Sequence, residues 1–301
     1  MLVTIFLVFL VLLIFNFLLD QLWKSDFKEK HFPKNIIFKE KEIELPEVEI
    51  GEEIPKKIYR CYSTYQEMQK FQKVFDLTEE RMKGYQQIYF DDNEVNEYIR
   101  KNFSERVYSA YCHINPEYGA ARADFFRYLV IYKEGGIYMD IKTGPSDKIL
   151  GFFEKNPYLL ISKGVSGIPH LPKQHLKNIF NLADDWSFIT NIWGGSEWQQ
   201  FIIASPKGNP ILKKVIQQVI SNIEEGIKNK NVYSSGHISV VAMTGPITYS
   251  LVIEKYKEKY KDCVKFFSPG LEHRIQHTLV DYKKIMGDKH YSKQKNKTIL
   301  V

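Results

Sequence analysis

The sequence has little cysteine, and several patterns that mark common protein classes are missing. Cys61, Cys112 and Cys263 lie far apart and form no Cys-x-x-Cys pair or zinc-finger spacing. Such an odd, sparse set is more typical of buried thiols than of a disulfide framework, although one bridge with a spare thiol stays open. The body has no Gly-rich phosphate loop, which nucleotidyltransferases generally carry, and no repeat of fixed period. These absences argue against nucleotidyltransferases, zinc fingers and solenoid folds.

The sequence also lacks a strong excess of charge of either sign. It has 42 basic and 36 acidic residues, which give a formal net charge of +6. The basic excess is spread over many short runs, and no arginine-rich stretch or RNA-binding aromatic motif is present. This balance suits anionic ligands or a membrane surface and argues against a nucleic-acid partner. A hydrophobic content of 44% and an aromatic content of 14% predict a folded body with a substantial core.

The first 19 residues, Met1–Leu19, contain no charged side chain, and only Thr4 and Asn16 are polar. A helix of this length extends roughly 28 Å, close to the thickness of the hydrocarbon core. The basic leading region and the small-residue cleavage site of a signal peptide are missing. The sequence therefore predicts an uncleaved transmembrane helix at residues 1–19.

The flanking sequence gives two opposing signals about the side of the membrane. Several lysines follow the span, which by the positive-inside rule favours a cytosolic body. The sequons that begin at Asn102 and Asn296 would matter only in a lumen, and large domains can be translocated despite flanking charge. We expect a single-pass protein, with an ER or Golgi type of membrane favoured. Residues 20–53 are charged and lack periodicity, so they predict a stem before one domain at residues 54–301.

The body alternates between strand-like and helix-like segments, which predicts an α/β fold. Expected strands and helices are bounded by turn and capping residues, such as Asp91-Asp92 before a helix and Gly135-Gly136 after one. The expected strands are 58–62, 86–90, 137–141, 201–204 and 264–267, and the expected helices are 95–102, 118–133, 210–227 and 246–259.

The densest group of candidate site residues lies between positions 120 and 142. On a helix, Asp124 and Arg127 share a face, and the Gly135-Gly136 turn folds the next strand back beside it. Asp140, at the end of that strand, can then reach the same place, which is where open α/β sheets bind ligands. The plainer alternative is a helix-surface ion pair, with Asp140 as a turn cap. Charged residues among Phe125, Phe126 and their apolar neighbours are costly unless partnered, which favours a site.

Four segments in this order and spacing resemble the family 32 glycosyltransferases, whose sugar-binding region contains an Asp-x-Asp motif. They are Ile54-Pro-Lys-Lys-Ile58, Asn115-Pro116, Ala121-Arg-Ala-Asp-Phe-Phe-Arg-Tyr128 and Gly135-Gly-Ile-Tyr-Met-Asp140. The match is strong over residues 54–150 and weaker beyond. The resemblance implies a GT-A fold and a retaining hexosyltransferase. The implied donor is a UDP- or GDP-sugar, and the implied acceptor is a hydroxyl of a glycan or glycolipid.

Carried over by position, Asp124, Arg127 and Asp140 would be the catalytic residues. Thr244-Gly245-Pro246 resembles a Thr-Gly-Pro element near the donor pocket, although alone it would indicate a helix start. Residues 184–186 and 191–196 have the polar and aromatic composition of an acceptor surface, or of a surface loop with one buried Trp. The residues implied to bind the donor are Ile58, Tyr59, Ala121, Asp124, Arg127, Tyr138, Asp140, Lys142, Thr244 and Gly245.

The sequence departs from the family pattern at Lys142, where the second Asp of the motif is expected. The implied metal is Mn²⁺ or Mg²⁺, with Asp140 and His290 as ligands. A protonated Lys cannot bind a metal ion, but its ammonium group could lie against a diphosphate and replace part of the metal's charge. The departure therefore makes a metal requirement uncertain. It also motivates an alternative, a catalytically inactive membrane-tethered protein that binds a nucleotide sugar or a glycan.

Overall fold

The computed structural model describes residues 41–149, 151–162, 198–229, 236–267, 274–281, 285 and 296–300. The predicted membrane span at residues 1–19 and most of the predicted stem lie outside these ranges. Among the residues that are described, no helix is both long enough and apolar enough to cross a bilayer.

The main sheet has six strands in the order β2-β1-β3-β6-β5-β7, and it is mixed. Strand β1 runs parallel to both β2 and β3, β6 runs antiparallel to β3 and β5, and β7 is parallel to β5. A small antiparallel pair, β4 with β8, lies outside this sheet. The strands are β1 Lys57–Cys61, β2 Gln86–Phe90, β3 Gly136–Met139, β4 Gly144–Pro145, β5 Leu159–Ile161, β6 Ile202–Ser205, β7 Val264–Phe266 and β8 Ile275–Gln276.

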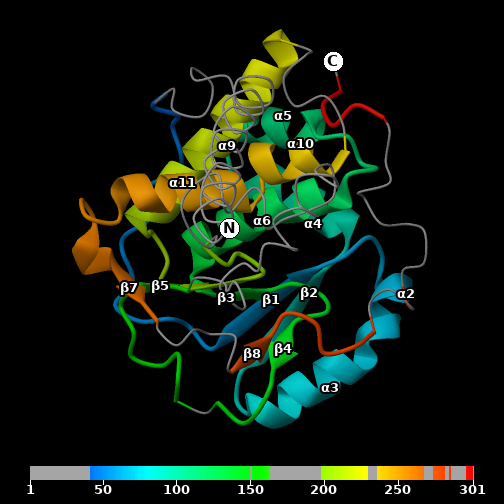
Figure 1. Ribbon diagram of the computed structural model, residues 1–301, viewed down its shortest axis with the longest axis vertical. Helices are drawn as coiled ribbons and strands as arrows, with labels where there is room; N and C mark the ends of the chain where they lie inside the picture. Colours follow the sequence, from blue (N-terminus) through cyan, green and yellow to red (C-terminus); the bar gives the residue numbers. More distant parts are fainter. Residues whose placement is uncertain are drawn as a thin grey trace, which may run out of the picture. The chain divides into compact units, whose positions relative to one another are not determined.

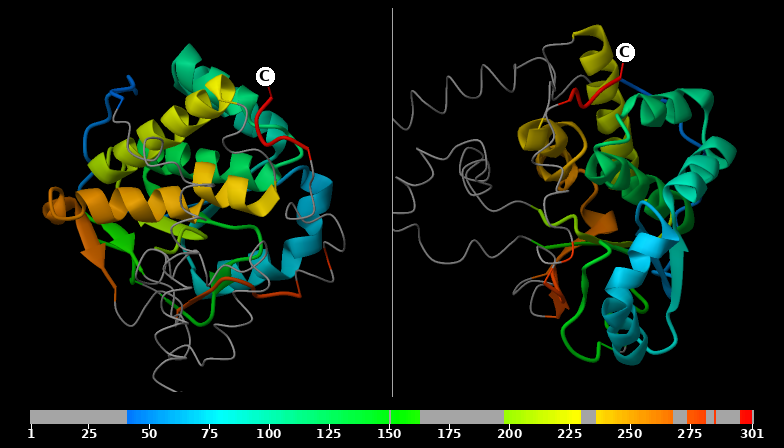
Figure 2. Two further views of the ribbon diagram at one scale, coloured as in Figure 1. Left: turned by 45° about the horizontal axis from the view of Figure 1, so that its top comes forward. Right: turned by 90° about the vertical axis from the view of Figure 1, so that its right-hand side faces the viewer.

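Helices lie on both sides of the sheet, which confirms the predicted α/β fold. Figure 1 shows α6, α9, α10 and α11 above the strands and α3 below them, near β4. In Figure 2, α11 (orange) and α9 (yellow-green) lie side by side over α6 (green). The helices are α2 Tyr65–Met68, α3 Gln72–Arg81, α4 Asp92–Asn102, α5 Glu105–His113, α6 Gly119–Glu134, α9 Pro210–Lys228, α10 Gly236–Met243 and α11 Pro246–Tyr256, with 3₁₀ turns η1 Gln69–Phe71 and η2 Lys261–Cys263.

Local sequence signals explain where several elements begin and end. The Asp91 side chain accepts hydrogen bonds from the backbone of Asn93 and Glu94, and the Glu94 side chain accepts one from the Asp91 backbone. This capping box starts α4 next to the end of β2. At the other end of the layer, α6 stops at Gly135, which has a φ of 69°. The predicted turn between helix and strand is therefore confirmed.

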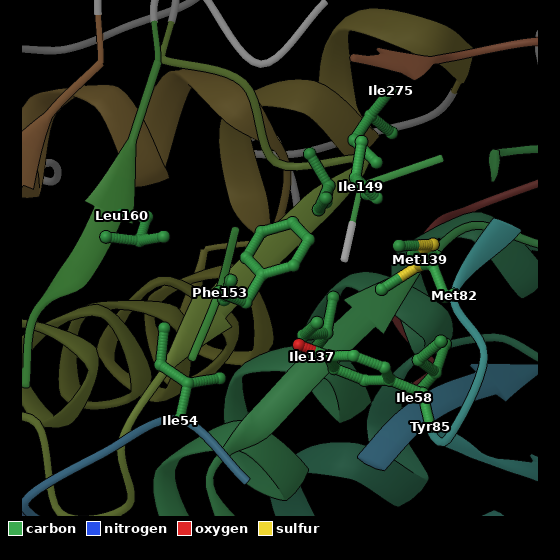
Figure 3. Packing of buried hydrophobic residues seen from close by; sticks show 12 residues of the cluster. Ile54, Ile58, Met82, Tyr85, Ile137, Met139, Ile149, Phe153, Leu160 and Ile275 are labelled. Atoms are coloured by element: carbon green, nitrogen blue, oxygen red, sulfur yellow. The ribbon is translucent and has the colours of Figure 1, made fainter. Parts of the chain in front are cut away.

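The sheet buries a hydrophobic cluster that crosses from β1 and β3 to β5 and β6. Figure 3 shows Ile58 and Ile137 on adjacent strands, with Phe153 packed against the cluster from the segment that precedes β5. This packing fixes the position of β3, whose last residue directly precedes Asp140. The candidate site thus begins directly after the strand that this cluster packs against.

A segment predicted to be stem also belongs to the folded body. The compact unit comprises Glu40–Val301, which starts earlier than residue 54. Ile43 and Leu45 are buried, and the Ile43 carbonyl accepts a hydrogen bond from the Gln217 side chain on α9 at 2.9 Å. The alternation of apolar and acidic residues over 43–50 indicates this packing. The signal is weak because the segment forms neither a helix nor a strand.

Candidate functional site

One arginine joins the two carboxylates that the sequence places near each other. Nη2 of Arg127, on α6, lies 3.0 Å from Oδ1 of Asp124 and 2.9 Å from Oδ1 of Asp140. Asp124 is one helical turn before Arg127, and Asp140 directly follows β3, which the Gly135-Gly136 turn folds back against the helix. The predicted meeting of these three side chains at the end of β3 is therefore confirmed.

The Asp124–Arg127 pair is buried, so the alternative of a helix-surface ion pair is wrong. Their side chains are 6% and 5% exposed. Thr244 Oγ1 donates to Asp124 Oδ2 at 3.1 Å, and Gln200 Nε2 donates to Asp124 Oδ1 at 3.2 Å. Arg127 Nη1 donates to the Gln200 carbonyl at 2.7 Å, and the guanidinium lies 4.7 Å from the centre of the Tyr138 ring. The pair is held on all sides by protein.

Burial changes the ionisation of both members of this pair. Loss of hydration raises the pKa of Asp124 to about 7, although Arg127 pulls it down and the Thr244 and Gln200 hydrogen bonds favour the ionised form. Burial lowers the pKa of Arg127, but Asp140, the Tyr138 hydroxyl and Asp124 more than offset this, and the net pKa is raised. Arg127 therefore stays charged, and of its neighbours Asp140 does most to raise its pKa.

Asp140 is the most accessible of the three, with a side chain 23% exposed. It begins a tight turn in which the Thr143 backbone N–H donates to the Asp140 carbonyl at 2.8 Å. Lys142 lies within this turn and is partly buried. Loss of hydration lowers the pKa of Lys142, with Asp140 acting to raise it and Arg127 to lower it. The turn thus presents one carboxylate and one lysine at the end of the parallel strands.

The sequence did not identify His277 as a member of this site. Its Nε2 lies 3.9 Å from Oδ2 of Asp140, and its ring packs on Phe201 with centroids 4.6 Å apart. Loss of hydration and the nearby Lys142 lower the pKa of His277 to about 4, so the imidazole is neutral at pH 7. The segment that carries it is fixed to the turn by two hydrogen bonds, Leu279 N–H to the Lys142 carbonyl at 3.0 Å and Thr143 Oγ1 to the His277 carbonyl at 2.9 Å.

Sequence reasoning also missed Gln200 and Arg60, because both lie far along the chain from the residues that they contact. Gln200 is 76 residues from Asp124, and Arg60 is 80 residues from Asp140, whose carbonyl its guanidinium contacts. Neither belongs to a motif. Only the strand order, which places β6 and β1 on either side of β3, brings them to the site.

The described residues do not fit a site for a divalent cation. Among them, no group of three or more His, Cys, Asp or Glu side chains is close enough to hold a metal ion. Asp140 is already paired with Arg127, and an ammonium group occupies position 142 where a second carboxylate would be needed. The other predicted ligand, His290, lies outside the described residues. The turn after β3 therefore offers a ligand the Asp140 carboxylate and the Lys142 ammonium group, and not a pair of carboxylates.

The remaining residues predicted to bind the donor form the interior beside this site. These residues are almost completely buried, and Ile58 belongs to the hydrophobic cluster of the sheet. Thr244 is the one that contacts the carboxylates directly. The predicted acceptor surface, residues 184–186 and 191–196, lies outside the described residues. The buried residues are Ile58, Tyr59, Ala121, Tyr138, Thr244 and Gly245.

Sequence comparisons place this site within a known region. Residues 55–160 match the model of the glycosyltransferase sugar-binding region containing the DXD motif. An initiation-specific α-1,6-mannosyltransferase of Schizosaccharomyces pombe is 28% identical over 142 residues, which are 45% of this chain and 31% of that protein. An uncharacterized glycosyltransferase of Acanthamoeba polyphaga mimivirus is 29% identical over 142 residues, 42% of this chain and 55% of that protein. The chain thus spans about a third to a half of the length of these relatives.

Solved structures give weaker similarities. The PaToxG glycosyltransferase has a TM-score of 0.41 at 18% identity, covering 69% of this chain and 70% of that one. The UDP-bound glycosyltransferase domain of the YGT toxin has a TM-score of 0.34 at 11% identity, covering 67% of this chain and 56% of that one. The region that contains Asp124, Arg127 and Asp140 is therefore similar in sequence to the glycosyltransferase sugar-binding region that contains the DXD motif.

Proposed function

We propose that the chain is a retaining glycosyltransferase of GT-A type that moves a hexose from a nucleotide-sugar donor to a hydroxyl group of a glycan or glycolipid. The observation that carries the proposal is the bridge from Arg127 to both Asp124 and Asp140 at the end of β3. It lies inside the region that matches the family, at the carboxyl end of β3, and ligands of open α/β sheets bind at the carboxyl ends of strands. Buried charges of this kind are costly to maintain and are concentrated at functional sites.

The residues of the site would have three different roles in transfer. Asp140, the most exposed of the carboxylates, would contact the donor. Arg127 and Asp124 are both buried. Arg127 would hold Asp140 in position through their ion pair, and Asp124 would hold Arg127. Breaking the bond between the sugar and the nucleotide diphosphate leaves negative charge on the leaving group, which Lys142 would stabilise. Partial burial makes such an interaction stronger than it would be in bulk water.

A donor screen on the purified 301-residue chain tests this proposal. Ligands that bind the native state raise its unfolding temperature, so UDP-glucose, UDP-galactose, UDP-N-acetylglucosamine and GDP-mannose would be compared by thermal shift. Each donor that binds would then be assayed for release of nucleoside diphosphate with and without an oligosaccharide acceptor. We expect one donor to bind and to turn over. Binding of a donor without any turnover would instead support the catalytically inactive alternative, and no binding at all would overturn both.

We also propose that the chain is attached to a membrane of ER or Golgi type as a single-pass protein. The support is the uncharged apolar run Met1–Leu19 in the sequence. Expression of the chain with and without these residues, followed by alkaline carbonate extraction, tests it. The intact chain should stay in the pellet and the truncated chain should be released, and release of both would contradict the proposal.

A further inference from the structure

Arg60 is a fully buried cation near the end of β1, the strand next to β3. It has 0% exposure, and within the described ranges the structure gives it no ion pair with a carboxylate. Buried arginines without a counter-ion are rare, because removing the charge from water is costly. Burial does lower the pKa of Arg60, but only to about 10, so the guanidinium remains charged at neutral pH.

The guanidinium is directed at the backbone of the turn that carries Asp140 and Lys142. A single nitrogen, Nη1, donates to the Asp140 carbonyl and to the Thr143 carbonyl, each at 2.7 Å. These carbonyls are the two ends of the turn, which the Thr143 N–H closes by donating to the Asp140 carbonyl. Both contacts are therefore charge-assisted hydrogen bonds to the same short piece of chain.

The other side of the guanidinium is held by α3, so Arg60 cannot easily move away from the turn. Nη2 donates to Thr78 Oγ1 at 3.1 Å, and the group lies 5.7 Å from the centre of the Phe75 ring. Nε has no hydrogen-bond partner among the residues that the structure describes. An apolar side chain of similar size would fill this space without the cost of burying a charge. The contacts made by the terminal nitrogens are thus what the arginine provides at this position.

We propose that Arg60 is a positioning residue for the donor site. Its guanidinium holds the Asp140–Thr143 turn in the conformation that places Asp140 against Arg127 and sets the direction of Lys142. Arg60 does not itself contact the donor. The inference rests on the proposed function for its effect on transfer, but its effect on the turn can be measured without any ligand.

Two substitutions of Arg60 and one control test the proposal. Arg60→Met keeps the length of the side chain and removes its donors, whereas Arg60→Lys keeps the charge without the fork that spans two groups. Arg81→Met is the matched control, because Arg81 Nη1 donates to the Pro145 carbonyl at 2.8 Å, just beyond the turn. For each variant of the intact chain, amide hydrogen exchange of the peptides that contain Thr143 is measured without donor. The kcat and KM for the donor and the unfolding midpoint are measured alongside.

In Arg60→Met, the loss of two hydrogen bonds should accelerate exchange of the Thr143 amide by about ten-fold or more, while amides of α9 stay protected. kcat should fall by at least about ten-fold at temperatures well below unfolding, because misplacement of a site costs turnover steeply. Arg60→Lys should show both effects to a smaller degree. Arg81→Met should leave Thr143 exchange and kcat close to those of the wild type.

Wild-type exchange of the Thr143 amide in Arg60→Met would overturn the proposal, as would an acceleration shared by amides throughout the domain. If Arg60→Met does not fold, Arg60→Lys decides alone, and wild-type exchange and kcat in that variant would count against a positioning role. Failure of the proposed function is a separate outcome. If the wild-type chain turns over no donor, transfer is excluded, but the exchange result still shows whether Arg60 holds the turn.

Discussion

Replacement of either member of the Asp124–Arg127 pair should have very different consequences, although the two side chains are in contact. Arg127 touches both Asp124 and Asp140, so Arg127→Met leaves two carboxylates close together with no cation between them. Breaking a buried ion pair from one side costs about 3–5 kcal/mol of folding free energy. In Asp124→Asn, Arg127 keeps Asp140 as its partner and its hydrogen bond to the Gln200 carbonyl. The expected loss is then about 1–2 kcal/mol, typical of an altered hydrogen-bond network.

The dependence of this difference on pH follows from the raised pKa of Asp124. Its folded-state value of about 7 lies above the unfolded value of about 3.9, so the native state binds more protons between these limits. The stability contributed by this titration is fully present below about pH 4 and is lost as the pH rises through about 7. Arg127→Met removes the cation that lowers the pKa of Asp124, so the loss should continue to higher pH. The penalty of Arg127→Met should be larger at about pH 8 than at about pH 6.

Urea unfolding of the purified variants, followed by tryptophan fluorescence at both pH values, measures these free energies. The double variant Asp124→Asn with Arg127→Met completes a double-mutant cycle and isolates the interaction between the two positions. Asp124→Asn should rescue part of the stability that Arg127→Met loses, since it removes one unpaired carboxylate. Equal losses in the two single variants, or a penalty for Arg127→Met that does not change with pH, would refute the reasoning.

Three further predictions concern the effect of metal removal, the residue at position 142 and the Gly135-Gly136 turn. Excess EDTA should lower wild-type turnover by less than about ten-fold, equivalent to about 1.4 kcal/mol, and complete loss of activity in EDTA would show that a metal is held after all. Lys142→Asp supplies a second carboxylate near Asp140, so its turnover should depend on added Mn²⁺, which a titration of Mn²⁺ against initial rate would detect. Gly136→Ala should lower the free energy of unfolding by more than about 1 kcal/mol, because Gly136 has a φ of 100° and an added Cβ would lie 2.8 Å from the Lys57 carbonyl oxygen. Gly119→Ala is the control in the same urea experiment, because nothing lies within 4 Å of its added Cβ, and a helix start that gains alanine should be unchanged or more stable by up to about 1 kcal/mol.

The local parts of the site could be predicted because they depend on spacing along one stretch of chain. Asp124 and Arg127 are one helical turn apart, and the double glycine fixes the return of the chain, so Asp140 had to come near them. The strand at 86–90 and the cap at Asp91 were equally local and are confirmed. The burial of the ion pair was also foreseeable, because its neighbours on the helix are large and apolar.

The parts that could not be predicted depend on which strands become neighbours. β6 inserts antiparallel between β3 and β5, and this order brings Gln200 beside Asp124. His277 reaches Asp140 because the short strand β8 pairs with β4. Helix α5, at Glu105–His113, was not predicted, although its buried residues Val107, Ala110 and Tyr111 lie at helical spacing. The pairing of distant segments is set by the whole core, which no single motif encodes.

The central claim is that Asp140 contacts the sugar donor, and one pair of variants tests this claim most directly. Asp140→Ala removes the accessible carboxylate, whereas Asp147→Ala removes an exposed carboxylate of the same segment whose Oδ1 accepts a hydrogen bond from the backbone of Lys148. With the donor found in the screen, the account predicts that Asp140→Ala abolishes transfer but still folds, with a lower unfolding midpoint because Arg127 keeps only Asp124 as a carboxylate partner, and that Asp147→Ala transfers at the wild-type rate. Wild-type transfer by a folded Asp140→Ala protein would contradict the account.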